Sequence, residues 1–191
     1  MMISVDILND KKVIAALKKM DSFAAPDALR KALRDTSKKA PPRLSKEIRQ
    51  EYTLTAKRIK RDIRIKPLEQ GFKYLVSVSH RPITVMQYKM KPNPWRKMPQ
   101  GGLGFSIYKG QKEFVKGGFV AEGKQGINLP FKRVGPRPRP FYTLYGPSIA
   151  GIVRGDSKFG GSIMGRVERE LTAGLSAAVN RRFGAFLRGY G

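Results

Sequence analysis

The candidates for acid–base or metal chemistry are the histidine and the acids of the C-terminal region: His80, Asp156, Glu168 and Glu170. His80 is the single histidine, and no Gly-x-Ser-x-Gly turn accompanies it to present a nucleophilic serine. Glu168 and Glu170 are two positions apart on a predicted helix, so they point to different faces, and Asp156 stands alone in a glycine-rich stretch. Because two-metal hydrolysis needs several converging acids, this pattern predicts no catalytic residue and no metal site.

The glycine-rich segment 101–104, Gly-Gly-Leu-Gly, could be mistaken for a phosphate cradle. A P-loop continues with Lys and then Ser or Thr at a helix start, whereas Phe105-Ser106-Ile107 is typical of a strand. The Gly-x-x-Gly of a KH domain lies between helices, which does not fit either. The chain has no cysteine, so thiolate nucleophiles and Cys-based metal sites are excluded, and we predict that it uses no cofactor.

The remaining chemistry is that of cations. The chain has 39 Lys and Arg against 14 Asp and Glu, a net charge of +25 on 191 residues. Residues 74–140 alone carry thirteen basic and two acidic side chains. Solubility needs a net charge of only about 2–8. The excess therefore indicates contact with a polyanion or with an acidic protein surface, and the composition leaves both alternatives open.

The candidate interface or lumen-facing residues are cations in the middle of the chain, with one tryptophan among them. They are Lys89, Lys91, Trp95, Arg96, Lys97, Lys132, Arg133, Arg137 and Arg139. Trp95 could stack on a base or anchor a subunit interface. A further basic group covers residues 57–66, where a predicted helix leads into a strand.

The spacing of apolar residues predicts the helices and strands that position these cations. Residues 3–7 alternate as a strand, and residues 13–20 have the spacing of a helix. A stripe at spacings of three or four then runs from Leu29 to Tyr52, which predicts one long helix kinked or broken at Pro41-Pro42. Thr55 caps a short helical turn through Arg61.

Alternation with a period of two then predicts strands over the middle of the chain. Residues 63–78 form a hairpin that turns at 67–71, and further strands are expected at 105–108, 114–115, 119–121 and 127–134. Residues 89–104 and 133–140, rich in Pro and Gly, are predicted loop extensions. A short helix at 149–153 and a long one from 163 to 186 close the chain.

This order predicts one domain over residues 1–191 with an α+β fold, in which an antiparallel sheet packs against an N-terminal helical region and a long C-terminal helix. No apolar run approaches the ~18 residues of a membrane span, so we expect no membrane contact. The N-terminus lacks the basic and apolar regions of a signal peptide, and the absence of cysteine fits a reducing cytosol.

Several short motifs follow one another in a fixed order over nearly the whole length. They are Tyr52-Thr53-Leu54-Thr55, the strand 72–78, Phe119-Val120-Ala121, Leu129-Pro130 and the segment Leu144-Tyr145-Gly146-Pro147-Ser148-Ile149 before the closing helix. This order resembles the phage minor tail protein Z family, the tail-completion proteins of tailed phages and prophages. The chain departs from that pattern where residues 134–140 lengthen the passage between Leu-Pro and Gly-Pro-Ser.

The resemblance implies a non-enzymatic protein of the virion, assembled in the host cytoplasm and placed at the neck, the head-proximal end of the tail. It implies a homo-oligomeric ring, with a hexamer favoured, that finishes the tail tube and joins it to the head connector. The implied partners are the tail tube protein and the head–tail connector proteins, with the tape-measure protein and genomic DNA in the channel as further candidates.

Two other hypotheses stay open at this point. The charge alone also fits a general nucleic-acid-binding basic protein, whose affinity would fall steeply with salt. A nuclease or basic toxin would require metal-dependent cleavage that is lost on mutating Asp156 or Glu168.

Overall fold

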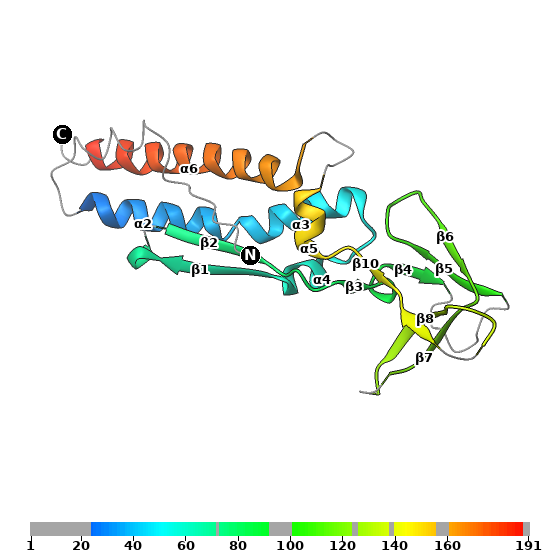
Figure 1. Ribbon diagram of the computed structural model, residues 1–191. Helices are drawn as coiled ribbons and strands as arrows, with labels where there is room; N and C mark the ends of the chain where they lie inside the picture. The colour runs from blue at the N-terminus through cyan, green and yellow to red at the C-terminus, as the bar shows by residue number, and fades with distance from the viewer. Residues whose placement is uncertain are drawn as a thin grey trace.

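The computed structural model describes residues 24–71, 73–91, 101–123, 126–137, 140–155 and 161–188, which form an elongated α+β protein (Figure 1). Its helices are α2 (Ala24–Ser37), α3 (Ala40–Glu51), α4 (Ala56–Arg61), α5 (Ile149–Arg154) and α6 (Ile163–Arg188). Its strands are β1 (Ile63–Leu68), β2 (Lys73–Val78), β3 (Ile83–Thr84), β4 (Lys89–Lys91), β5 (Gly102–Ser106), β6 (Glu113–Lys116), β7 (Gly118–Glu122), β8 (Asn128–Arg133), β9 (Phe141–Thr143) and β10 (Tyr145–Gly146). Short 3₁₀ helices occupy η2 (Glu69–Gly71) and η3 (Val85–Gln87).

The predicted α+β class is confirmed, and the strands of the described residues form small antiparallel sheets instead of one continuous sheet. These sheets are β1-β2, β3-β10, β4-β5-β6 and β7-β8-β9. The strand predicted at 3–7 and the helix predicted at 13–20 lie outside the described residues.

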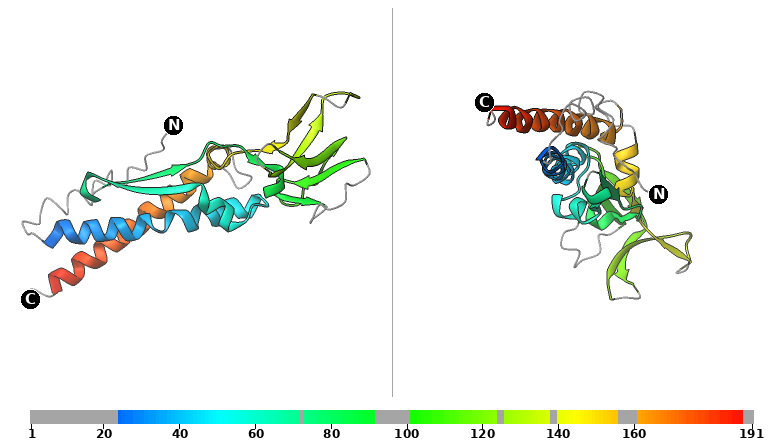
Figure 2. Two further views of the ribbon diagram at one scale, coloured as in Figure 1. Left: turned by 90° about the horizontal axis from the view of Figure 1, so that it is seen from below. Right: turned by 90° about the vertical axis from the view of Figure 1, so that its left-hand side faces the viewer.

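The helical body has three layers, with α6 on one side, α2 and α3 in the middle, and the β1-β2 hairpin on the other side (Figures 1 and 2). The middle layer follows the predicted apolar stripe, because Leu33, Leu44 and Ile48 are almost completely buried. On the outer faces Lys31, Arg34, Lys46 and Arg49 are exposed, as expected for amphipathic helices.

The break between α2 and α3 lies at Lys38 and Lys39, shortly before the proline pair. Pro41 and Pro42 fall in the first turn of α3, where a backbone N–H has no partner within the helix in any case. The stripe continues in phase across the break. The prediction of one helical region with a brief break is therefore confirmed, although the break lies two residues before the prolines.

Helix α6 buries a residue at each turn along one side. The buried residues are Ile163, Val167, Leu171, Leu175 and Val179. The helix begins after Ser162, whose hydroxyl accepts a hydrogen bond from the Gly165 N–H at 3.1 Å. This cap satisfies one of the free amides of the first turn.

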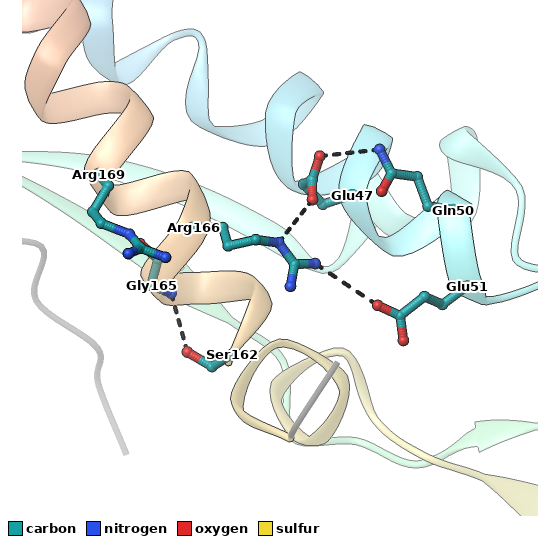
Figure 3. Close-up of polar contacts among 7 residues, drawn as sticks. All are labelled: Glu47, Gln50, Glu51, Ser162, Gly165, Arg166 and Arg169. Carbon is teal, nitrogen blue, oxygen red and sulfur yellow. Dashed lines mark hydrogen bonds and ion pairs between the residues drawn. The ribbon is translucent and has the colours of Figure 1, made fainter. Parts of the chain in front are cut away.

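A cluster of ionic contacts joins α6 to α3 (Figure 3). The Nε of Arg166 donates to Oε2 of Glu47 at 3.1 Å, and its Nη2 lies 3.7 Å from Oε1 of Glu51. Arg43 and Glu170 form a second ion pair between the same helices, with 2.5 Å between the nearest nitrogen and oxygen. These pairs connect helices that are distant in sequence.

The β1-β2 hairpin has the predicted alternation. Ile63 pairs with Val78 and Ile65 with Val76, so these four side chains share the face toward the core. The turn is shorter than predicted, because β1 continues through Pro67 and Leu68 and the turn residues are Glu69–Gly71. Before the hairpin, Thr55 caps α4 by accepting from the Arg58 N–H at 3.3 Å, which confirms that prediction.

The sheets β4-β5-β6 and β7-β8-β9, here called the β head, lie at one end of the helical body (Figures 1 and 2). The prediction of a loop over all of 89–104 was wrong at its two ends, where β4 pairs with β5, Lys89 opposite Ser106 and Met90 opposite Phe105. Met90 and Phe105 are buried, and this burial explains why the segment joins the sheet despite its Pro and Gly content.

The predicted segment 133–140 connects β8 to β9. Its first residue, Arg133, belongs to β8, and the Val134 N–H donates to the Pro140 carbonyl at 3.1 Å across the base of the connection. The chain then forms β9 and β10 and enters α5, which Ser148 caps by accepting from the Gly151 N–H at 3.1 Å. The helix predicted at 149–153 is confirmed.

Candidate interaction surface on the β head

The sheet β7-β8-β9 carries a cluster of aromatic rings on one face. The register places Phe119 opposite Phe131 and Arg133 opposite Phe141, so these side chains share a face by alternation. The centroid of the Phe131 ring is 5.7 Å from that of Phe119 and 4.9 Å from that of Phe141. The Arg133 guanidinium lies 5.1 Å from the Phe119 ring centroid, a cation–π contact.

The β head and the adjoining β10 also expose large apolar side chains. The large hydrophobic residues that are exposed in the described part of the chain are Phe114, Ile127, Val134, Phe141, Tyr142 and Tyr145. They all lie between residues 114 and 145, in β6, β9, β10 and the loops that flank β8. Tyr145 is 54% exposed and Phe114 64%, so water covers much of each ring. Large apolar side chains exposed together in one region of a protein are typical of an interaction surface.

The structure brings part of the predicted cationic set to the β head. Lys89 begins β4 and is exposed, Lys132 and Arg133 lie in β8, and Arg137 is exposed in the β8–β9 connection. Lys91 ends β4. The other predicted residues, Trp95, Arg96, Lys97 and Arg139, lie outside the described residues.

The exposed aromatic residues were not among the predicted site residues. The available signal was the run Phe141-Tyr142-Thr143-Leu144-Tyr145, which follows the proline-rich segment and has three aromatic rings within five positions. Alternation in such a run indicates a strand with one buried face, and which rings stay exposed depends on what packs against the strand.

Aromatic and polar contacts fix the β head to the helical body. The rings of Tyr52, at the end of α3, and Tyr108, after β5, have centroids 4.8 Å apart. The Thr53 hydroxyl donates to the carbonyl oxygens of Ser106 and Ile107 and accepts from the Lys89 N–H at 3.1 Å. These contacts hold β4 and β5 against the end of α3.

Two tyrosines in this junction have perturbed acidity. Burial raises the pKa of Tyr52 well above its usual range, and the hydrogen bond with the Tyr108 hydroxyl raises it further. Burial also raises the pKa of Tyr88, whose hydroxyl donates to the Pro147 carbonyl at 2.8 Å. Both phenols are therefore neutral and act as structural hydrogen-bonding groups.

Of the residues considered for catalysis, the three that the structure describes are exposed and form no cluster with other acids or histidines. His80 is exposed after β2, while Glu168 and Glu170 are exposed on α6, where Glu170 pairs with Arg43. Asp156 lies outside the described residues. Among the residues that the structure describes, no group of three or more His, Asp or Glu side chains could hold a metal ion.

An elongated protomer with exposed aromatic rings and cations at one end has the features of a protein that binds other macromolecules. Residues 9–188 match the family model of the prophage minor tail protein Z (GPZ), and the chain therefore belongs to this family. It is a phage minor tail protein and is associated with the virion. Searches of curated proteins and of solved structures returned no match. Within the described ranges, no helix has the length and apolar character needed to cross a membrane.

Proposed function

We propose that this chain is a tail-completion protein that acts at the head-proximal end of the phage tail. In this proposal copies of the chain form a closed ring, with a hexamer favoured, that finishes the tail tube and joins it to the head connector. A ring requires two different surfaces on each protomer, which meet head to tail. The elongated shape, with a β head at one end of a helical body, offers surfaces of clearly different character (Figure 1).

The observation that carries the proposal is the gathering of exposed apolar side chains on the β head and β10. A free protein gains nothing from leaving the rings of Tyr142 and Tyr145 in water, because burying apolar surface stabilises by about 25 cal/mol per Å². Exposed aromatic residues are enriched in the energetically dominant parts of protein interfaces. We therefore assign this surface to contact with a neighbouring copy or with a tail component.

The net charge of +25 influences how such a ring forms. Protomers of one sign repel each other, and the repulsion is screened only beyond the Debye length of about 8 Å at physiological salt. Ring closure is therefore favoured on an acidic partner, which offsets the repulsion. The tail tube protein and the connector proteins are the partners we propose, with tape-measure protein or DNA in the channel as additional contacts.

The proposal is tested by deleting the gene from the phage or prophage that encodes the chain and examining lysates by negative-stain electron microscopy. We expect filled heads together with separate tails that lack a finished head-proximal end. Complementation with the wild-type gene should restore joined particles. Complete, infectious virions from the deletion strain would contradict the proposal.

A further inference from the structure

A cleft of about 530 Å³ opens at the edge of the β head, beside the turn that joins β5 to β6. Its walls are Thr53, Lys89, residues 104–106 of β5 and residues 109–113 of the turn and the start of β6. It was not predicted from the sequence, because its walls come from segments up to sixty positions apart. Its volume falls within the range of sites that bind small molecules or a few side chains.

The turn that forms one wall is held at several points. The Ser106 hydroxyl donates to the carbonyl oxygen of Tyr108 at 2.9 Å and to that of Gln111. The Lys109 N–H donates to the Glu51 carbonyl at 2.7 Å, which fixes the turn to the end of α3. The cleft is therefore a defined feature of the fold.

The charged residues that line the cleft are mostly basic. Lys89, Lys109 and Lys112 line it and are exposed, against the single carboxylate of Glu113. Within the described part of the chain these lysines form no ion pair. Three lysines that line one cavity favour an anionic ligand, because each ammonium group can form a charge-assisted hydrogen bond to an oxygen anion.

The shape of the cleft decides between two classes of anion. A DNA duplex presents its phosphates on the outside of a wide cylinder, and such a surface suits an open groove or a flat basic face better than a cavity of this size. Glutamate and aspartate side chains, in contrast, are small enough to enter a cavity of this size individually. The geometry favours carboxylates presented by a peptide segment.

We propose that this lysine cleft binds an acidic segment of a partner protein, with carboxylates meeting Lys89, Lys109 and Lys112. Only the assignment of the partner to a neighbouring tail component rests on the function proposed above. The binding itself is a property of the isolated chain and does not require a ring.

The test uses the full chain and a fluorescent hexaglutamate peptide, with binding followed by fluorescence anisotropy at low salt. The cleft variant is Lys109→Gln with Lys112→Gln. The matched control is Lys31→Gln with Lys38→Gln, which removes the same charge from exposed positions on the helical body. Circular dichroism melting of all three proteins checks that they are folded, and a fluorescent DNA duplex is titrated in parallel.

We expect the cleft variant to bind hexaglutamate about tenfold or more weakly than the wild type, while the control changes by about twofold or less. Equal losses in the two variants would overturn the proposal, because they would mean that net charge alone attracts the peptide. The proposal would also be overturned if the wild type does not bind hexaglutamate. The same holds if the cleft variant loses only its binding to the DNA duplex. Ring formation and head joining are not measured here, so failure of the proposed function remains a separate result.

Discussion

Arg166 of α6 and Glu47 of α3 are 119 positions apart in sequence and meet through a hydrogen bond of 3.1 Å between Nε and Oε2. The same guanidinium approaches Glu51, whose side chain is only 3% exposed (Figure 3). The contact joins the last helix to the first half of the fold. It is also partly buried, and a buried charge that loses its partner is costly.

Substituting this arginine should therefore destabilise the protein strongly. We expect Arg166→Ala to lower the free energy of unfolding by about 3 kcal/mol, because Glu47 and Glu51 lose their cation. Urea denaturation measures the change. Arg169→Ala, at an exposed position on the same helix, is the matched control and should cost about 0.5 kcal/mol or less. Equal losses in the two variants would show that the ion pairs contribute little.

Replacing either of two glycines with alanine should change the free energy of unfolding, but in opposite directions for the two positions. A Cβ at Gly174, on the exposed side of α6, meets no atom within 4 Å, so Gly174→Ala should stabilise by about 1 kcal/mol through helix propensity. A Cβ at Gly102 would lie 2.2 Å from the Val115 carbonyl oxygen, so Gly102→Ala should destabilise by about 2–3 kcal/mol or more. Thermal unfolding followed by circular dichroism compares the two variants. If both variants are stabilised or both are destabilised, the structure around one of the two glycines is contradicted.

The buried tyrosines predict a loss of stability in alkali. An unfolded tyrosine ionises with a pKa of about 10, whereas burial holds the Tyr52 and Tyr88 phenols neutral beyond that pH. The unfolded state then binds fewer protons than the native state, so stability is fully present below pH 10 and falls above it, by about 1.4 kcal/mol per pH unit for each such tyrosine.

Tyr88→Phe separates this effect from other alkaline effects. At neutral pH it should cost about 1 kcal/mol, because the hydrogen bond to the Pro147 carbonyl is lost. Above pH 10 its free energy of unfolding should fall less steeply than that of the wild type. Tyr142→Phe, at a position that is 47% exposed, is the matched control. An unchanged slope in Tyr88→Phe would refute the prediction.

The exposed aromatic surface predicts a defect in assembly without a defect in folding. Tyr142→Ser with Tyr145→Ser removes two exposed rings, so the chain should fold normally but bind its partner about thirtyfold or more weakly. Complementation of a gene-deleted phage, scored as plaque yield, measures the effect. Tyr142→Phe with Tyr145→Phe keeps the rings and should complement; wild-type yield from the serine variant would argue against an interface here.

Local signals predicted much of the helical body. Leu33, Leu44 and Ile48 could be identified because their helical spacing does not depend on any distant segment. The cap at Thr55 was recognisable for the same reason, since a side-chain oxygen before a helix acts within three residues.

The β head and its site were harder to predict because they depend on long-range pairing. Lys89–Lys91 looked like part of a loop, and only the pairing with Gly104–Ser106 makes it a strand. The lysine cleft likewise exists because Thr53 fastens β5 to the end of α3. Neither contact leaves a periodic trace in the sequence.

The proposed function is that this minor tail protein finishes the tail at its head-proximal end, with the β head as its contact surface. Cryo-electron microscopy of virions from the encoding phage tests it most directly. We expect a ring of this chain between the tail tube and the head connector, with Tyr142 and Tyr145 buried against a neighbouring subunit. Density for the chain at the opposite end of the tail, or a β head whose rings face solvent in the virion, would contradict the claim.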